Sequence, residues 1–148
     1  MSDSKQSLRL WLKLLSCSTA IEKKARAMLI ERFDTTLPRF DVMAALDREP
    51  EGLTMSALSE HLLVSNGNVT AIVARLVEDG LVTRTQDKSD RRVLRVKLTA
   101  KGKRDFRLYA SAHEAWIEQL LGDLADAEIS QLQSGLSRVK TSIERSGL

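Results

Sequence analysis

Apolar positions in the first third of the chain recur every three or four residues, which is the period of an amphipathic helix. They indicate one long helix from Leu8 to about Asp34. Pro38 suits the first turn of a second helix, which would end between residues 48 and 52. The apolar face of the first helix is Leu10, Leu14, Cys17, Ile21, Ala25 and Met28, and that of the second is Phe40, Met43, Ala44 and Leu46.

Two short amphipathic helices are predicted next. Thr54 is a candidate N-cap for a helix over 55–62, and Ser65 is a candidate N-cap for a second helix that Gly80 ends. Two such helices joined by about three residues are typical of a helix-turn-helix. The core-facing positions of the second helix are Val69, Ile72, Val73, Leu76 and Val77.

The period then changes to the alternation of strands. Residues 81–86 and 93–98 are predicted strands, and the polar residues 87–91 form the tip of their hairpin. Thr99 is a candidate N-cap for a long helix that runs to about Gly122, and a last helix covers 126–146. The pattern predicts a mainly α fold: a winged helix-turn-helix between N- and C-terminal helices.

Composition supports this fold. The chain has 148 residues, 43% of them hydrophobic and 4% aromatic, with 7 Gly and 2 Pro. So few turn-forming residues argue against a sandwich or barrel of many strands. Charges at Arg9 and Lys13 break the apolar run over 8–15, so it resembles neither a secretory signal nor a membrane span, and we expect a cytoplasmic protein.

The charge is unevenly distributed. The net charge is only +3, but residues 84–107 hold ten Lys or Arg against three Asp. This segment therefore carries +7, and the rest of the chain carries −4. A basic segment on an acidic body is typical of a protein that binds a polyanion such as double-stranded DNA.

The second helix of the pair has an outward face suited to a DNA groove. Small residues allow close approach, and Asn and Thr side chains can hydrogen-bond base edges and phosphates. Ser65 and the helix start suit a phosphate oxygen. An ordinary solvated helix is the alternative, which the adjacent basic hairpin disfavours. The outward face is Asn66, Gly67, Thr70, Ala71 and Ala74, with Asn68 and Arg75 beside it.

The tip of the hairpin carries two adjacent arginines. Arg91 and Arg92 can reach a narrow minor groove, where guanidinium groups are favoured. Asp90 is unexpected in a loop that binds a polyanion, and we interpret it as a brace that orients a neighbouring arginine. The alternative is a solvated, charged loop.

The terminal helices carry more apolar surface than one small winged helix can cover. A two-fold partner would hide it and hold two recognition helices about 34 Å apart, roughly one turn of DNA. An intramolecular bundle is the alternative. The candidate dimerisation residues are Leu10, Leu14, Ile129, Leu132, Leu136, Val139 and Ile143.

Enzyme and metal functions find little support. His113-Glu114 begins like a zinc-protease helix, but Ile117 stands where the second histidine would be. The one cysteine, Cys17, excludes an intramolecular disulfide and a multi-cysteine zinc site. We expect no catalytic residues, no metal site and no cofactor.

Several motifs together resemble the MarR family of bacterial transcription regulators, over about residues 8–146. The motifs are Leu37-Pro38-x-Phe40, Met55-x-x-Leu58-Ser59, Val64-Ser65-x-x-x-Val69-Thr70, Arg75-Leu76-x-x-x-Gly80-Leu81-Val82-x-Arg84, Asp90-Arg91-Arg92 and Leu98-Thr99-x-x-Gly102.

The resemblance implies a homodimer that binds palindromic operators and represses transcription. It implies that 37–99 is the DNA-binding region and that 1–36 and 100–148 form the dimerisation region. Either Arg91 or Arg92 would enter the minor groove, with Asp90 as its brace. The candidate DNA-binding residues are Thr54, Ser65, Asn66, Gly67, Asn68, Thr70, Arg75, Arg84, Lys88, Asp90, Arg91 and Arg92.

Family members often bind small aromatic carboxylates between the dimerisation helices and the winged helix. Some segments are similar to members that respond to aromatic acids or their CoA thioesters. The residues that could bind such an effector also have ordinary structural interpretations: the tryptophans could be packing residues, His61 a surface residue and Arg39 a solvated side chain. The candidate effector-binding residues are Trp11, Arg39, His61, Tyr109, His113 and Trp116.

Other functions stay open. Cys17 raises the possibility of peroxide sensing, but a cysteine on an apolar face is more often inert packing. A DNA-binding protein without an effector and a winged-helix module that binds only proteins are the remaining alternatives.

Overall fold

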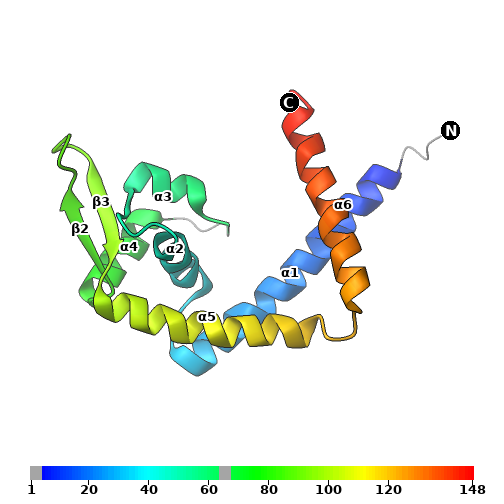
Figure 1. Ribbon diagram of the computed structural model, residues 1–148, viewed down its shortest axis with the longest axis horizontal. Helices are drawn as coiled ribbons and strands as arrows, with labels where there is room; N and C mark the ends of the chain where they lie inside the picture. Colours follow the sequence, from blue (N-terminus) through cyan, green and yellow to red (C-terminus); the bar gives the residue numbers. More distant parts are fainter. Residues whose placement is uncertain (1–4, 64–67) are drawn as a thin grey trace. The chain divides into compact units, whose positions relative to one another are not determined.

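Six helices and three short strands make up the part of the chain that the computed structural model describes, residues 5–63 and 68–148 (Figure 1). The chain divides into two compact units, residues 1–115 and 116–148. The elements are α1 Gln6–Phe33, α2 Leu37–Asp47, β1 Leu53–Thr54, α3 Met55–His61, α4 Val69–Glu78, β2 Val82–Gln86, β3 Leu94–Leu98, α5 Ala100–Leu120 and α6 Asp126–Arg145.

Side-chain caps explain where several helices begin. The hydroxyl of Thr54 accepts a hydrogen bond from the backbone N–H of Ala57 at 3.1 Å, as its predicted capping role requires. Thr99 caps α5 in the same way, accepting from the N–H of Gly102 at 2.9 Å.

The predicted start of the second short helix is wrong. The N-cap of α4 is Asn68, whose side chain accepts from the backbone N–H of Ala71 at 3.1 Å. Ser65, the predicted cap, lies outside the described residues. Serine and asparagine cap helices almost equally well, so composition alone does not separate the two positions. α3 ends at His61 and α4 begins at Val69, and residues 64–67 between them lie outside the described residues.

Gly80 ends α4 as predicted. Its φ of +73° is the left-handed conformation that glycine adopts without steric cost. The N–H of Leu81 donates to the carbonyl of Leu76 at 2.9 Å, and the N–H of Gly80 donates to that of Val77 at 3.0 Å. This pair of bonds is the Schellman motif, which turns the chain directly into β2.

The strands form an antiparallel sheet in the order β1-β3-β2. The hairpin pairs Val82 with Leu98 at its base and Gln86 with Leu94 next to its tip. The sequence did not predict β1, which pairs Leu53 with Val96, because two residues are too few to show an alternating pattern.

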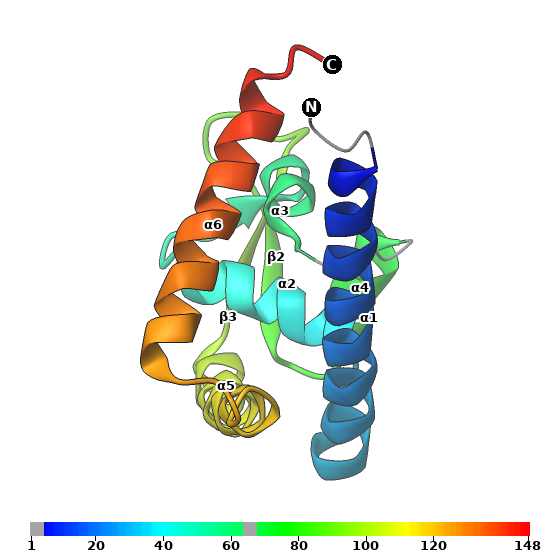
Figure 2. The ribbon, with the colours of Figure 1, turned by 90° about the vertical axis from the view of Figure 1, so that its right-hand side faces the viewer.

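The core of the first unit lies where α2 packs against α3, α4 and β3 (Figure 2). Ala44, Val69 and Ile72 are only half-buried. Val77 is 36% exposed, so these four positions differ from the predicted core. Gly102 allows α5 to approach the hairpin, since an added Cβ would lie 2.0 Å from the carbonyl oxygen of Leu81. The largest fully buried side chains are Leu29, Met43, Leu46, Leu58, Leu76, Val42, Val73 and Val96.

The apolar residues of the terminal helices are largely uncovered. In α1 only Ala25 and Leu29 are buried, and α6 has no buried residue. Cys17 is exposed, so the packing role expected for it is not observed: few apolar neighbours cover that part of α1. Among the described residues, no helix is long and apolar enough to cross a membrane.

Candidate nucleic-acid interface

The outward face of α4 is exposed over its first turn. Thr70 and Ala71 are exposed, and so is Arg75 one turn further along the helix, whereas Ala74 is half-buried. Asn68 uses its side-chain oxygen to cap the helix, which leaves its amide N–H₂ group to donate elsewhere. Three predicted contact residues, Ser65, Asn66 and Gly67, lie outside the described residues.

At the tip of the hairpin, Asp90 contacts Arg92. Its Oδ1 accepts hydrogen bonds from the backbone N–H of Arg92 at 3.0 Å and from the Nε of the same residue at 3.3 Å. The Arg92 side chain is 91% exposed, so its remaining donors face solvent. Of the two candidate arginines, Arg92 is therefore the one that an aspartate orients.

A second aspartate ties the hairpin to the rest of the sheet, which sequence reasoning missed. Asp87 Oδ1 accepts from Arg95 Nε at 2.9 Å, and the Nη1 of the same arginine donates to the carbonyl of Gly52 at 3.2 Å. The hydroxyl of Ser89 also donates to Asp87. Hydrogen bonding by Ser89 and then by Arg95 lowers the pKa of Asp87 below its ordinary value of 3.8.

The remaining predicted DNA contacts differ in how available they are. Arg84 on β2 and Lys88 and Arg91 in the hairpin loop are exposed. Thr54 is half-buried and its hydroxyl caps α3, so it offers less to an external partner.

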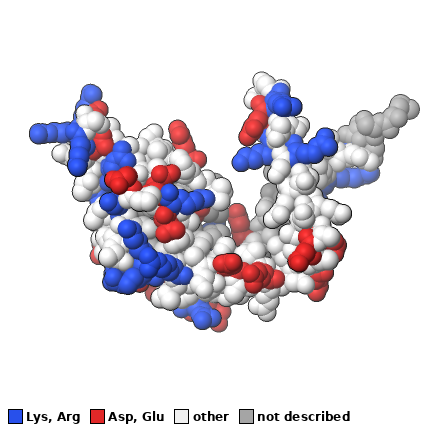
Figure 3. Space-filling view, in the orientation of Figure 1, with Lys and Arg blue, Asp and Glu red and all other residues white. Residues whose placement is uncertain are grey.

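The basic segment 84–107 extends from the hairpin to α5, since Arg84 lies on β2 and Arg95 and Lys97 lie on β3. In Figure 3, Lys and Arg side chains gather at the tip of the hairpin and again over the first half of α5. The hairpin separates them, because the strands run from the start of α5 toward the tip (Figure 1). Charge counted along the sequence does not reveal this division.

A partly exposed ion pair links the start of α2 to the end of α4. Arg39 Nη2 forms an ion pair with the carboxylate of Asp79, the residue that follows α4. The Arg39 side chain is only 18% exposed, which excludes the expectation that it is simply solvated. Among the described residues, Arg39 Nε is the one buried side-chain nitrogen or oxygen without a hydrogen-bond partner.

Rings on α5 contact rings on α1 and α2. The ring of Tyr109 lies 4.8 Å from that of Phe33, and the ring of His113 lies 4.8 Å from that of Phe40. Burial raises the pKa of Tyr109, with a smaller contribution from Asp105, and burial lowers the pKa of His113. Of the predicted effector residues, His113 therefore lies against α2 and Tyr109 against α1. Tyr109 also interacts electrostatically with Arg39 of α2.

The other three candidates are placed differently. Trp11 is 55% exposed on α1. His61 is exposed on α3, and its Nδ1 bonds to the carbonyl of Ala57 in the same helix at 2.7 Å. Trp116 is buried and belongs to the second unit.

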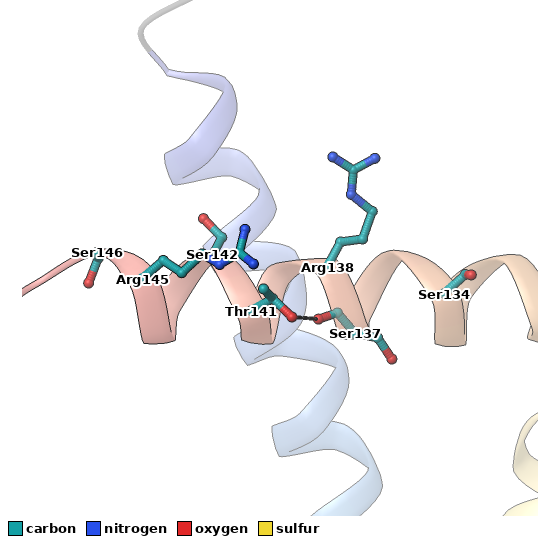
Figure 4. A pocket seen from close by; sticks show the side chains of 7 residues that line it. All are labelled: Ser134, Ser137, Arg138, Thr141, Ser142, Arg145 and Ser146. Carbon is teal, nitrogen blue, oxygen red and sulfur yellow. Dashed lines mark hydrogen bonds between the residues drawn. The ribbon is translucent and has the colours of Figure 1, made fainter.

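Neither a metal nor a ligand is indicated on α6. A hollow on this helix is lined only by α6 residues, so it is an open polar face (Figure 4). The one hydrogen bond drawn there runs from Thr141 Oγ1 to the carbonyl of Ser137. Within residues 5–63 and 68–148, no group of His, Cys, Asp or Glu could hold a metal ion. The lining residues are Ser134, Ser137, Arg138, Thr141, Ser142, Arg145 and Ser146.

These features define a winged helix-turn-helix protein with an oriented arginine on its wing, a class that binds DNA. Residues 33–93 match the model of the MarR family. The chain is 33% identical to a MarR family transcriptional regulator from Silicibacter pomeroyi, whose crystal structure superposes with a TM-score of 0.83 and covers 97% of this chain and 99% of that one. The chain belongs to the MarR family of transcriptional regulators.

Two further relatives bear on activity. Transcriptional activatory protein BadR of Rhodopseudomonas palustris is 26% identical over 97% of this chain and 85% of its own length. FabT of Streptococcus pneumoniae, whose structure was solved in complex with DNA, is 26% identical with a TM-score of 0.73, over 94% of this chain and 98% of FabT. The family members named here as regulators, BadR and the Silicibacter pomeroyi protein, are transcription regulators rather than enzymes.

Proposed function

We propose that this regulator is a homodimeric repressor that binds a palindromic operator and is released by a small aromatic acid or its CoA thioester. The observation that carries the DNA-binding part is Arg92, which is 91% exposed at the tip of the wing and braced by Asp90. A guanidinium held in this way loses less conformational freedom when it enters a minor groove.

The two DNA-contacting elements, α4 and the wing, bind different parts of the DNA. The outward face of α4 reads base edges in the major groove through Thr70, Arg75 and the segment 65–68. The wing binds the minor groove and adjacent phosphates through Arg84, Lys88, Arg91 and Arg92. Thr54 contributes at the start of α3. Phosphate contacts supply most of the affinity, and the base contacts select the sequence.

Dimerisation uses residues 1–36 and 100–148, around a DNA-binding region of 37–99. The exposed apolar residues of α6 support it, since Leu132, Leu136 and Ile143 are 53%, 46% and 67% exposed in one protomer. Large exposed apolar side chains on one helix face are typical of an interface. The proposed dimer interface also includes Leu10, Leu14, Ile129 and Val139.

The effector binds near Arg39, Tyr109 and His113. The unpartnered Nε of Arg39 and the neighbouring rings suit a carboxylate on an aromatic body. A carboxylate that competes with Asp79 for Arg39 would loosen the end of the recognition helix α4. The effector would thereby favour dimer conformations that bind the operator poorly.

The first test is an electrophoretic shift with the DNA upstream of the protein's own gene, at 50 and 200 mM salt. A regulator that neutralises six or more phosphates loses on the order of a thousandfold in affinity between these conditions. Absence of a shift at either salt concentration would favour the protein-interaction module instead.

Two further experiments test repression and the effector. Adding the protein should lower transcription from that DNA in vitro, and the effector should restore it; a rise on adding the protein would make it an activator, as BadR is named. Aromatic acids and their CoA thioesters should raise the melting temperature if they bind the native state. If none does so, the regulator acts without such an effector.

A further inference from the structure

One arginine of the wing joins separate parts of the first unit. Arg95 lies on β3, the middle strand of the sheet, and its side chain is 38% exposed. Its Nε donates to Asp87 at the start of the hairpin loop, and its Nη1 donates to the carbonyl of Gly52, just before β1. Arg95 therefore connects the wing to the turn that leads into the helix-turn-helix.

The turn at Gly52 is held close to the sheet. Gly52 has a φ of +80°, which glycine adopts without steric cost, and an added Cβ would collide with the carbonyl oxygen of Val96. Leu53 follows in β1, and Thr54 then caps α3. The carbonyl that accepts from Arg95 is thus a fixed point near the first helix of the pair.

In the other direction, Arg95 reaches the loop that carries Arg92. The backbone N–H of Asp87 donates to the carbonyl of Val93 at 2.8 Å, and the N–H of Val93 donates to the carbonyl of Asp90 at 3.0 Å. The carboxylate of Asp90 in turn accepts from the Nε of Arg92 at 3.3 Å. A continuous series of contacts therefore runs from Arg95 to Arg92.

The loop depends on these contacts because the strand pairing ends before it. The last pair is Gln86 with Leu94, so residues 87–93 extend beyond the paired strands. None of residues 87–93 is buried, so apolar packing contributes little to their position. The aspartate at the base of the loop is also better shielded from water than the one at the tip: the Asp87 side chain is 15% exposed and that of Asp90 is 41% exposed. Shielding strengthens an ion pair, so the contact at the base holds the loop more firmly.

We propose that Arg95 is a positioning residue for DNA recognition, which fixes the wing tip relative to α3 and α4. Arg95 itself does not contact DNA. It holds the loop at the angle at which Arg92 enters the minor groove while α4 lies in the major groove. A wing that is already ordered avoids the entropic cost of ordering it on binding. The proposal rests on the proposed function, because it requires Arg92 to contact DNA.

The test is a double-mutant cycle on the affinity of the full-length protein for an operator fragment, by fluorescence anisotropy at about 150 mM salt. Arg95→Met keeps the apolar stem and removes the guanidinium, and it should weaken binding about threefold to tenfold. In an Arg92→Ala background, the same substitution should change the affinity by less than about twofold, because the contact that it positions is gone.

Lys97→Met is the matched control. Lys97 is an exposed cation two residues further along β3, on the same face as Arg95, and it forms no ion pair among the described residues. The control should bind within about twofold of the unmodified protein. Asp87→Ala removes the carboxylate that Arg95 contacts, so it should reproduce the Arg95→Met result in both backgrounds.

A second measurement distinguishes positioning from a general loss of stability. The ¹⁵N order parameters of residues 88–93 in the free protein should fall in Arg95→Met, and those of α4 should stay unchanged. Thermal unfolding checks that each variant is folded.

Several outcomes would overturn the proposal. Equal losses from Arg95→Met with and without Arg92 would show that the two arginines act independently. If the salt dependence also became shallower by about one counterion, Arg95 would be a phosphate contact instead. Equal effects of Arg95→Met and Lys97→Met, or unchanged order parameters in the loop, would also contradict it.

The cycle separates this proposal from the proposed function. If Arg92→Ala weakened operator binding and Arg95→Met did not, the wing contact would stand and the positioning role would be wrong. If Arg92→Ala bound as tightly as the unmodified protein, both would be wrong.

Discussion

Two aspartates in the hairpin loop stabilise different arginines. Asp90 orients Arg92 within two residues, a local contact that sequence spacing suggests. Asp87 binds Arg95, which also reaches the carbonyl of Gly52, 43 positions away in the chain. The second contact depends on the pairing of β1 with β3, and no local pattern contains that information.

The carboxyl of Asp87 should titrate below pH 3.8. Its hydrogen bonds from Ser89 and Arg95 favour the ionised form, so the contact is fully present above pH 3.8 and is lost as the pH falls through the lower pKa of the folded protein. A carboxyl-detected NMR titration measures the midpoint.

Ser89→Ala should move that midpoint up toward 3.8, because Ser89 makes the largest contribution. Ser59→Ala, which removes an exposed hydroxyl bonded to the carbonyl of Met55 in α3, is the control and should leave it unchanged. A midpoint at or above 3.8 in the unmodified protein would refute this account of the hairpin.

At the scale of elements, the end of the recognition helix is held from two sides. Asp79 pairs with Arg39 of α2, and its backbone carbonyl accepts from Lys101 Nζ of α5 at 3.1 Å. Thr99 Oγ1 donates to the carbonyl of Gly80 at 2.7 Å. A change at α2 or α5 therefore reaches α4 directly.

Asp79→Asn should destabilise the fold by about 1–2 kcal/mol, because it leaves the mostly buried charge of Arg39 without its carboxylate. The estimate lies between the values for exposed and for buried pairs, since Asp79 itself is 45% exposed. Urea unfolding at a fixed protein concentration measures it.

Glu78→Gln is the matched control, because Glu78 is an exposed neighbour that forms no ion pair in the described structure. It should change the free energy of unfolding by less than about 0.5 kcal/mol. Equal effects of the two substitutions would mean that the Arg39 pair contributes nothing.

Most elements were predictable because each shows its period over several turns or residues. The starts of α2 and α5 follow from Pro38 and Thr99, and the extent of α6 follows from apolar spacing. The start of α4 could not be predicted, since Ser65 and Asn68 are both good N-cap residues. The Arg39–Asp79 ion pair could not be predicted from the sequence either, because it joins residues 40 positions apart.

At the scale of the whole molecule, the uncovered apolar face of α6 is the feature that one chain does not explain. Leu132, Leu136, Val139 and Ile143, spaced by four, three and four residues, predicted an amphipathic helix. The structure leaves that apolar face largely exposed. The sequence could not show whether this face is covered by another part of the same chain or by a second copy of the protein. The spacing of the apolar residues is the same in either case.

Leu136→Glu should shift the protein from dimer toward monomer, since it would bury an unpaired carboxylate in the proposed interface. We expect the dimer dissociation constant to rise at least about tenfold, as measured by sedimentation equilibrium. Ser137→Glu adds the same charge to the polar face of α6 and should leave the dimer intact. A monomeric unmodified protein, or equal effects of both variants, would exclude this interface.

The central claim is that Arg92 on the wing contacts DNA. The most direct measurement is the affinity for the operator of Arg92→Ala, by fluorescence anisotropy at about 150 mM salt. We predict a loss of about 1–3 kcal/mol, or roughly fivefold to 150-fold in the dissociation constant. Arg48→Ala, at an exposed position after α2, should bind as the unmodified protein does. An Arg92→Ala protein that binds within twofold of the unmodified one would contradict the account.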